Sequence, residues 1–197
     1  MTTPLPRRRR LQAQDRRTQI LDQAAALFIE RGFEGVSMAD IAAALHTSRP
    51  TIYTYFPSTE AILAELLDRR LEHLPERLAQ HLHTEDLTAF SELFQAIVQE
   101  SELLKLLHSG GGPQFRSRRA EFLGALQSRL NLEQLPGLKG ETLNAHPLLL
   151  PLLLDLITQV AYRQVTDPAP DPGGLLQLLN TFIRGGVHAV AVHDPRP

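Results

Sequence analysis

A short segment near the start of the chain concentrates side chains that can donate hydrogen bonds. Residues 37–56 read SMADIAAALHTSRPTIYTYF. The second half of this segment holds Arg49, Thr51, Tyr53, Thr54 and Tyr55. A guanidinium group can make two hydrogen bonds to the edge of a guanine, and a threonine methyl group can contact the methyl group of a thymine. Tyrosine and threonine hydroxyls can donate to phosphate oxygens, so the segment has the side chains that binding to double-stranded DNA requires.

Two short helices joined by a turn would hold these side chains on one face. Ser37 can cap the first helix, with Asp40 at its third position, as in a capping box. Ser48 can cap the second helix, and Pro50 falls in its first turn, where a missing N–H costs little. The spacing predicts a helix-turn-helix over residues 37–56.

A preceding helix is needed to cover this pair, because two short helices cannot bury enough apolar surface alone. Ile20, Ala24, Leu27 and Phe28 recur at the spacing of one helical face. We therefore expect a three-helix head over residues 14–60.

The rest of the chain also favours helices. Alternating runs of β-branched residues do not occur, whereas apolar residues recur at helical spacing. We expect an all-α protein in which residues 1–13 form a flexible basic arm, and residues 61–197 form a larger helical domain. Its helices are expected over residues 86–108, 113–130 and 173–192, and over a segment that begins at residue 146 or 150 and ends at residue 166.

Charge is distributed unevenly along the chain. The net charge is −2, yet residues 1–55 hold eight arginines against five acidic residues. Such a basic head suggests an anionic partner, and nucleic acid is one candidate. The cluster of Arg7, Arg8, Arg9, Arg10, Arg16 and Arg17 is interpreted either as an arm that follows a DNA backbone or enters the minor groove, or as a solvated tail.

Residues 17–63 resemble the DNA-binding domain of the TetR family of bacterial repressors in the order and spacing of the matched residues. The matched residues are Ile20-Leu21, Ala24-Ala25, Leu27-Phe28, Glu30-Arg31-Gly32-Phe33, Ser37, Asp40-Ile41-Ala42, Ser48, Thr51-Ile52-Tyr53, Tyr55-Phe56, Ser58 and Glu60-Ala61-Ile62-Leu63. The resemblance covers about a quarter of the chain. It implies a helical homodimer that binds a palindromic operator and whose C-terminal domain dimerises and binds a small inducer.

The resemblance also implies which residues contact DNA. The matched positions are Ser37, Ser48, Arg49, Pro50, Thr51, Tyr53, Thr54, Tyr55 and Thr59. His46 stands where the family has a turn glycine, so we expect a positive φ angle at a bulkier residue. Thr47 replaces the usual turn valine, and Thr59 replaces a lysine, so a phosphate contact at Thr59 would use a neutral hydroxyl.

Two C-terminal segments are apolar on more than one face, namely residues 148–165 and 175–192. A helix that is apolar all round must be buried on both sides. We expect the two segments of each subunit to form a four-helix bundle with a second copy of the chain, although a thick core of one monomer is the alternative. A dimer would hold two recognition helices about 34 Å apart, as successive major-groove faces require.

An effector pocket is expected among the middle helices, as in similar proteins, with a small and mostly hydrophobic ligand. The candidate lining residues are Phe90, Phe94, Leu104, Phe115, Phe122 and Leu126. Ordinary core packing is the alternative for each of them.

Other classes of function have little support in the sequence. The chain has no cysteine, which excludes thiolate zinc sites and thiol catalysis. His81 and His83 are two residues apart, a spacing that points them away from each other on a helix, so no metal site is expected. The HSGGG sequence at residues 108–112 lacks the G-x-S-x-G context of an esterase, and no nucleotide-binding loop or membrane span is evident.

We therefore expect a cytoplasmic, dimeric DNA-binding transcriptional regulator without cofactor or enzymatic activity. Repression, relieved by the effector, is favoured over activation. The alternatives are a helical partner-binding protein that no longer binds DNA, and an enzyme or metal-dependent module with an incidental helical head.

Overall fold

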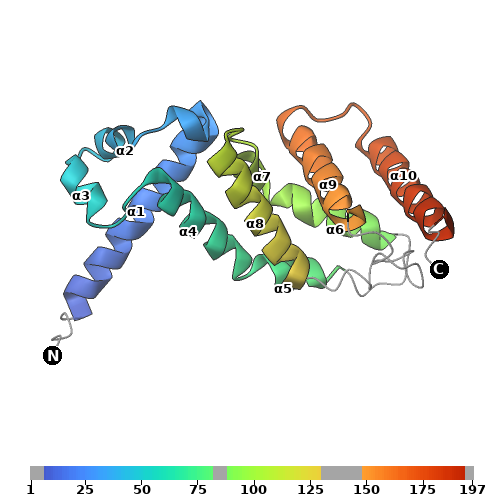
Figure 1. Cartoon of the computed structure of the whole chain (residues 1–197), viewed down its shortest axis with the longest axis horizontal. Helices are drawn as coiled ribbons and strands as arrows, with labels where there is room; N and C mark the ends of the chain where they lie inside the picture. Colours follow the sequence, from blue (N-terminus) through green and yellow to red (C-terminus); the bar gives the residue numbers. More distant parts are fainter. Residues whose placement is uncertain (1–6, 82–87, 130–147, 194–197) are drawn as a thin grey trace. The chain divides into compact units, whose positions relative to one another are not determined.

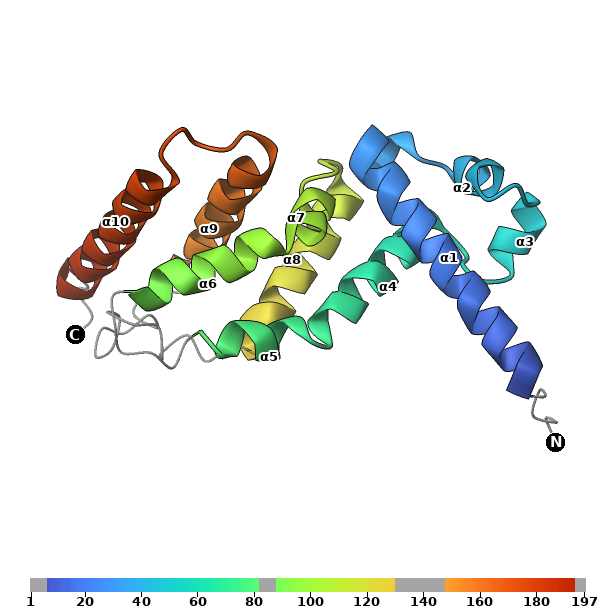
Figure 2. The same ribbon diagram turned by 180° about the vertical axis from the view of Figure 1, so that it is seen from behind.

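The computed structural model describes residues 7–81, 88–129 and 148–193, and all regular elements in these ranges are helices (Figures 1 and 2). The predicted all-α class is confirmed. The elements are α1 (Arg7–Arg31), η1 (Phe33–Gly35), α2 (Met38–Ala44), α3 (Arg49–Tyr53), α4 (Thr59–Leu71), α5 (Leu74–Ala79), α6 (Thr88–Gln99), α7 (Ser101–Leu107), α8 (Pro113–Arg129), α9 (Leu149–Thr166) and α10 (Pro172–His193).

The chain forms two compact units, which differ from the expected division at residue 60. The head unit comprises Met1–Arg69 and Leu106–Arg119, and the body unit comprises Arg70–Lys105 and Ala120–Pro197. Most of α4 and the segment from the end of α7 to the start of α8 therefore belong to the head unit. The sequence did not indicate this return of the chain, because the contacts that hold the segment join residues far apart in sequence.

Helix α1 begins at Arg7, so residues 7–13 are helical rather than part of a flexible arm. Arginine, leucine, glutamine and alanine are good helix formers, and extending an existing helix costs far less than nucleating a new one. Residues 1–6 of the expected arm lie outside the described residues.

The head unit has a continuous apolar core that the helical spacing predicted. Ile20, Ala24 and Phe28 are completely buried on the inner face of α1. The ring of Phe33 in η1 contacts Phe28 edge-on at 5.1 Å and Phe115 of α8 at 5.6 Å, measured between centroids. This aromatic contact ties the segment Leu106–Arg119 to the end of α1.

In the body unit α6 contacts α5, α9 and α10. Helices α9 and α10 lie side by side in both views (Figures 1 and 2). The expected helix over residues 86–108 is instead two helices, α6 and α7, interrupted at Glu100. Another interruption separates α4 from α5, which begins at Leu74 with Pro75 in its first turn, where a proline is tolerated. No helix within the described ranges is long and apolar enough to cross a membrane.

Candidate nucleic-acid interface

The start of α2 is fixed by the predicted capping box. The Ser37 side chain accepts a hydrogen bond from the Asp40 amide at 3.3 Å, and the Asp40 carboxylate accepts one from the Ser37 amide at 2.8 Å. The Ser37 hydroxyl also donates to Asp40, and this bond is the main cause that lowers the pKa of that carboxyl below its usual value. Ser37 is exposed, so a further contact from its hydroxyl is sterically open.

The turn between α2 and α3 has the left-handed backbone that the sequence predicted at His46. Its φ angle is 49°, and among the described residues it is the only non-glycine residue with a positive φ. Amides within the turn are used locally: His46 N–H donates to the Ala43 carbonyl at 3.0 Å and Thr47 N–H donates to the Ala42 carbonyl at 2.9 Å. The turn therefore closes through backbone hydrogen bonds, although His46 has a β-carbon, and its left-handed conformation costs backbone strain.

Helix α3 begins at the predicted cap and presents its polar side chains outward. The Ser48 hydroxyl accepts a hydrogen bond from the Thr51 amide at 3.3 Å, and Pro50 lies in the first turn. Ile52 is completely buried and anchors the helix, whereas Arg49 is exposed and Tyr53 is 54% exposed. A short rod that is held from one side and carries a cation and a phenol on the other can enter a major groove.

The other predicted contact residues lie at different depths on the same part of the head unit. Thr54 is exposed, but its hydroxyl donates to the Thr51 carbonyl at 2.6 Å, which leaves its oxygen as an acceptor and its methyl group as an apolar contact. The Thr51 and Ser48 hydroxyls are 2.8 Å apart. Tyr55 and Thr59 are half-buried. Contact with DNA at these positions remains a prediction.

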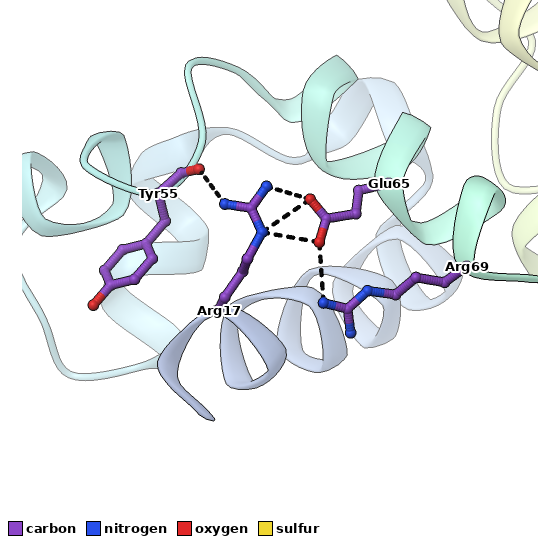
Figure 3. A network of polar contacts seen from close by, with 4 residues as sticks. All are labelled: Arg17, Tyr55, Glu65 and Arg69. Atoms are coloured by element: carbon purple, nitrogen blue, oxygen red, sulfur yellow. Dashed lines mark hydrogen bonds and ion pairs between the residues drawn. The ribbon is translucent and has the colours of Figure 1, made fainter. Parts of the chain in front are cut away.

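A polar cluster behind α3 was not predicted from the sequence (Figure 3). Arg17 of α1 donates to both carboxylate oxygens of Glu65 in α4, and its Nη1 donates to the Tyr55 carbonyl at 2.9 Å. The Arg69 Nη2 donates to the same carboxylate at 3.0 Å. From the sequence, Arg17 is grouped with the basic cluster, because a series of arginines indicates positive charge but not which carboxylate each one meets. Glu65 is too far away along the chain for a local spacing pattern to predict the pair.

The predicted effector residues that the structure describes are divided between the two units. Phe90 has no described side chain, and Phe115 lies in the aromatic core of the head unit. Leu104, Phe122 and Leu126 are buried in the body unit, and Phe94 is buried there too.

Phe94 is the member of that set that lines a cavity of about 310 Å³ in the body unit. Its walls come from α6, α9 and the start of α10, and none of the lining residues is charged. The lining residues are Phe94, Gln95, Val98, Gln99, Gln164, Pro172, Leu175 and Leu176.

Metal ligands are not gathered in the part of the chain that the structure describes. No group of three or more histidine, aspartate or glutamate side chains there is placed to hold a metal ion. His83, the second histidine of the pair with His81, lies outside the described residues.

Comparison with known proteins identifies the helix-turn-helix. Residues 20–66 match the family described as bacterial regulatory proteins, tetR family. The helix-turn-helix head of this chain therefore matches the TetR family. The match runs from the middle of α1 to α4, so it includes the caps, the turn at His46 and the whole of α3.

The strongest sequence similarity to known transcriptional regulators lies in this head. The transcriptional regulator EthR of Mycobacterium tuberculosis is 46% identical over 68 residues, which are 33% of this chain and 32% of EthR. The chain thus matches about a third of the length of that relative. The uncharacterised transcriptional regulator YdgC of Bacillus subtilis is 27% identical over 180 residues, covering 86% of this chain and 91% of YdgC.

Likeness in fold to a solved structure extends beyond the head to most of the chain. The fatty acid degradation regulator FadR of Bacillus halodurans superposes with a TM-score of 0.61 and 20% identity, covering 86% of this chain and 95% of FadR. At this identity the likeness concerns the fold alone, so the ligand and the operator have to be argued from the residues of this chain.

Proposed function

We propose that the chain is a transcriptional regulator that binds a palindromic DNA operator as a homodimer. The observation that carries the proposal is the outer face of α3. Arg49 and Tyr53 are exposed there, while Ile52 behind them is fully buried, within a head that matches the family's DNA-binding domain. The relatives EthR and YdgC are named as transcriptional regulators, and we propose the same role here in place of catalysis, in the compartment that holds the chromosome.

The dimer would form through α9 and α10. Leu148 and Leu152 are 66% and 65% exposed, and Leu178 and Phe182 are 68% and 66% exposed. Each pair is spaced by four residues, so each forms an apolar ridge on one helix face. Large exposed apolar ridges on neighbouring helices indicate an interaction site, and a self-complementary patch suits a two-fold dimer.

The small residues after Phe182 support this surface. A β-carbon added at Gly185 or Gly186 would meet no atom within 4 Å, so packing inside one subunit does not require glycine there. Small residues let helix backbones from two subunits approach closely. The four-helix bundle expected from residues 148–165 and 175–192 therefore remains our proposal.

The body-unit cavity is the site that we propose for an effector. Its volume of about 310 Å³ suits a small molecule, and its uncharged, mostly apolar lining favours an uncharged, mostly apolar one. The Gln164 Oε1 accepts a hydrogen bond from the Ala169 amide at 3.1 Å, which orients that side chain and leaves its NH₂ group as a donor. The name of FadR, a fatty acid degradation regulator, is in keeping with an apolar effector.

Selection of bound duplexes from random DNA tests the proposal directly. We expect enrichment of a site with two-fold symmetry, bound by an even number of chains, with an affinity that falls steeply as salt rises. Recovery of no sequence, and no salt-sensitive binding to any duplex, would favour the helical partner-binding alternative. Turnover of a substrate or stoichiometric metal would instead favour the enzyme alternative.

Repression by the chain, and its relief by an effector, are tested with the same duplex. A neutral apolar fluorescent probe, N-phenyl-1-naphthylamine, should bind the body-unit cavity and lower the affinity for the selected site. Val98→Trp fills the cavity, so it should exclude the probe and leave binding to the duplex intact. Equal probe binding by this variant would move the effector site elsewhere.

A further inference from the structure

Arg17 of α1 makes three different contacts with one guanidinium group (Figure 3). Its Nε lies 2.9 and 3.0 Å from the two carboxylate oxygens of Glu65, and its Nη2 also donates to Glu65. Its Nη1 donates to the Tyr55 carbonyl. Its Cζ lies 4.2 Å from the centre of the Phe56 ring. All four residues belong to the head unit.

The Tyr55 carbonyl lies immediately after the cap residue of α3, Thr54. The last carbonyls of a helix have no partner within the helix and are commonly satisfied by arginine or lysine side chains. Here the donor comes from a different helix, α1. Because α3 has only five residues, its direction depends on what holds its two ends rather than on its own hydrogen bonds.

The amino end and the middle of α3 are held by other groups. Ser48 caps the first turn, and the fully buried Ile52 anchors the helix to the core. Phe56 follows α3 and is 1% exposed, under the Arg17 guanidinium. Arg17 therefore supplies the polar attachment at the carboxyl end of α3, beside an apolar one.

Glu65 fixes the guanidinium in turn. A bidentate contact between arginine and carboxylate restricts the plane of both groups, which a single ion pair does not. Arg69, one turn further along α4, donates to the same carboxylate and restrains it from the other side. The hydrogen bond from Arg17 is the main cause that lowers the pKa of Glu65 below its usual value, so the carboxylate stays charged at neutral pH.

We propose that Arg17 is a positioning residue for DNA recognition, which with Glu65 fixes the carboxyl end of α3 to α1 and α4. The inference rests on the proposed function. It assigns Arg17 a role different from that of a general basic contact: its charge is paired with Glu65 within the head unit and is not offered to a phosphate. Pre-organisation of α3 then lets Arg49 and Tyr53 meet base edges in one orientation.

Glu65→Gln separates positioning from charge. Removing an acidic group from a DNA-binding unit should strengthen binding to every duplex if only the net field matters. Positioning predicts the opposite for the selected site, a loss of about tenfold, the factor expected for one charge-assisted hydrogen bond. Binding to an unrelated duplex of equal length should change by less than about twofold. Asp22→Asn, at an exposed carboxylate of α1, is the matched control for the loss of one negative charge.

Arg17→Gln and Arg17→Lys complete the set. Both should lower affinity for the selected duplex about tenfold, and both should leave the slope of log K against log salt unchanged. Arg16→Gln removes an identical charge from the neighbouring residue and should weaken both duplexes alike with a lower slope. The double variant of Arg17→Gln with Glu65→Gln should bind like either single variant, because the two groups act as one unit.

Several results would overturn the inference. A lower salt slope for Arg17→Gln, or tighter binding by Glu65→Gln, would make Arg17 a phosphate contact. The variants could instead be less stable to urea while their folded fraction keeps the wild-type ratio of affinities for the selected and the unrelated duplex. That result would limit Arg17 and Glu65 to a structural role. If Arg17→Gln does not fold, Arg17→Lys and Glu65→Gln still decide. Failure of the wild-type chain to select any duplex would instead overturn the proposed function, and the inference with it.

Discussion

The amide of Gly112 donates a hydrogen bond to the Glu34 carboxylate, with 2.6 Å between the nitrogen and Oε1. The Gly111 amide donates to the same oxygen at 3.0 Å. Helix α8 begins directly after these amides, at Pro113, so the carboxylate also lies at the positive end of a helix. A third bond, from the Phe33 amide to the Ser109 carbonyl at 2.7 Å, completes the attachment of the segment Leu106–Arg119 to η1.

This attachment should depend on pH. The bond from Gly112 is the main cause that lowers the pKa of Glu34 below its usual value. A carboxyl whose pKa is lower in the folded state stabilises that state above the unfolded pKa, and the stabilisation is lost as pH falls through the folded pKa.

Glu34→Gln keeps an oxygen acceptor but removes the titration. The free energy of unfolding of wild type relative to Glu34→Gln should therefore decrease as pH falls from about 7 to about 3, measured by urea unfolding. The same change at the exposed Glu72 controls for the loss of one negative charge. A constant difference between wild type and Glu34→Gln over that range would contradict the prediction.

His46→Gly should stabilise the head unit. A residue with a β-carbon in the left-handed region destabilises the folded state by about 1–2 kcal/mol. Glycine removes this strain, but its greater conformational freedom in the unfolded chain offsets about 0.5–1 kcal/mol of the gain. We expect the free energy of unfolding to rise by about 0.5–1 kcal/mol in urea titrations. His46→Ala keeps the strain and should bring no such gain, so equal stabilisation by both variants would contradict the account.

Arg49→Ala tests direct contact with a base. Loss of a bidentate contact to guanine should cost about 1–3 kcal/mol on the selected duplex and relax the preference at one base pair of each half-site. Affinity for that duplex and for its single-base variants measures this. Arg31→Ala, at an exposed arginine at the end of α1, is the charge-matched control. Equal losses on selected and unrelated DNA would limit Arg49 to a backbone contact.

Phe182→Glu tests the dimer surface. A carboxylate in the middle of an apolar interface would lose its hydration without a partner, a cost of several kcal/mol. We expect monomers in sedimentation experiments and a loss of affinity for the two-fold site, with helix content unchanged. Gln177→Glu introduces the same charge at another exposed position of α10. A Phe182→Glu protein that remains dimeric would exclude this surface.

Replacement of Arg7, Arg8, Arg9 and Arg10 by glutamine tests the basic start of α1. Glutamine is a good helix former, so α1 should keep its length while losing four charges. If the segment follows the DNA backbone, the slope of log K against log salt should fall by about 0.9 for each phosphate that the variant no longer neutralises. An unaltered slope would mean that these arginines do not contact DNA.

Local features of the recognition site could be predicted from the chain alone. Ser37 and Ser48 caps, the proline in the first turn of α3, and the left-handed turn at His46 depend on neighbours within a few residues, so their patterns can be seen directly in the chain. The buried face of α1 follows for the same reason, because helical periodicity is a local property.

Contacts between residues from distant parts of the chain depend on the folded structure. Arg17 and Glu65 are 48 residues apart and Glu34 and Gly112 are 78 apart, so no spacing rule links them. Tertiary packing also sets the boundary of the head unit, in whose core Phe115 lies, whereas Phe94 lines the body-unit cavity. The sequence shows that Arg17 is charged and that Phe115 is apolar. Which carboxylate pairs with Arg17, and which core buries Phe115, depend on how the chain folds.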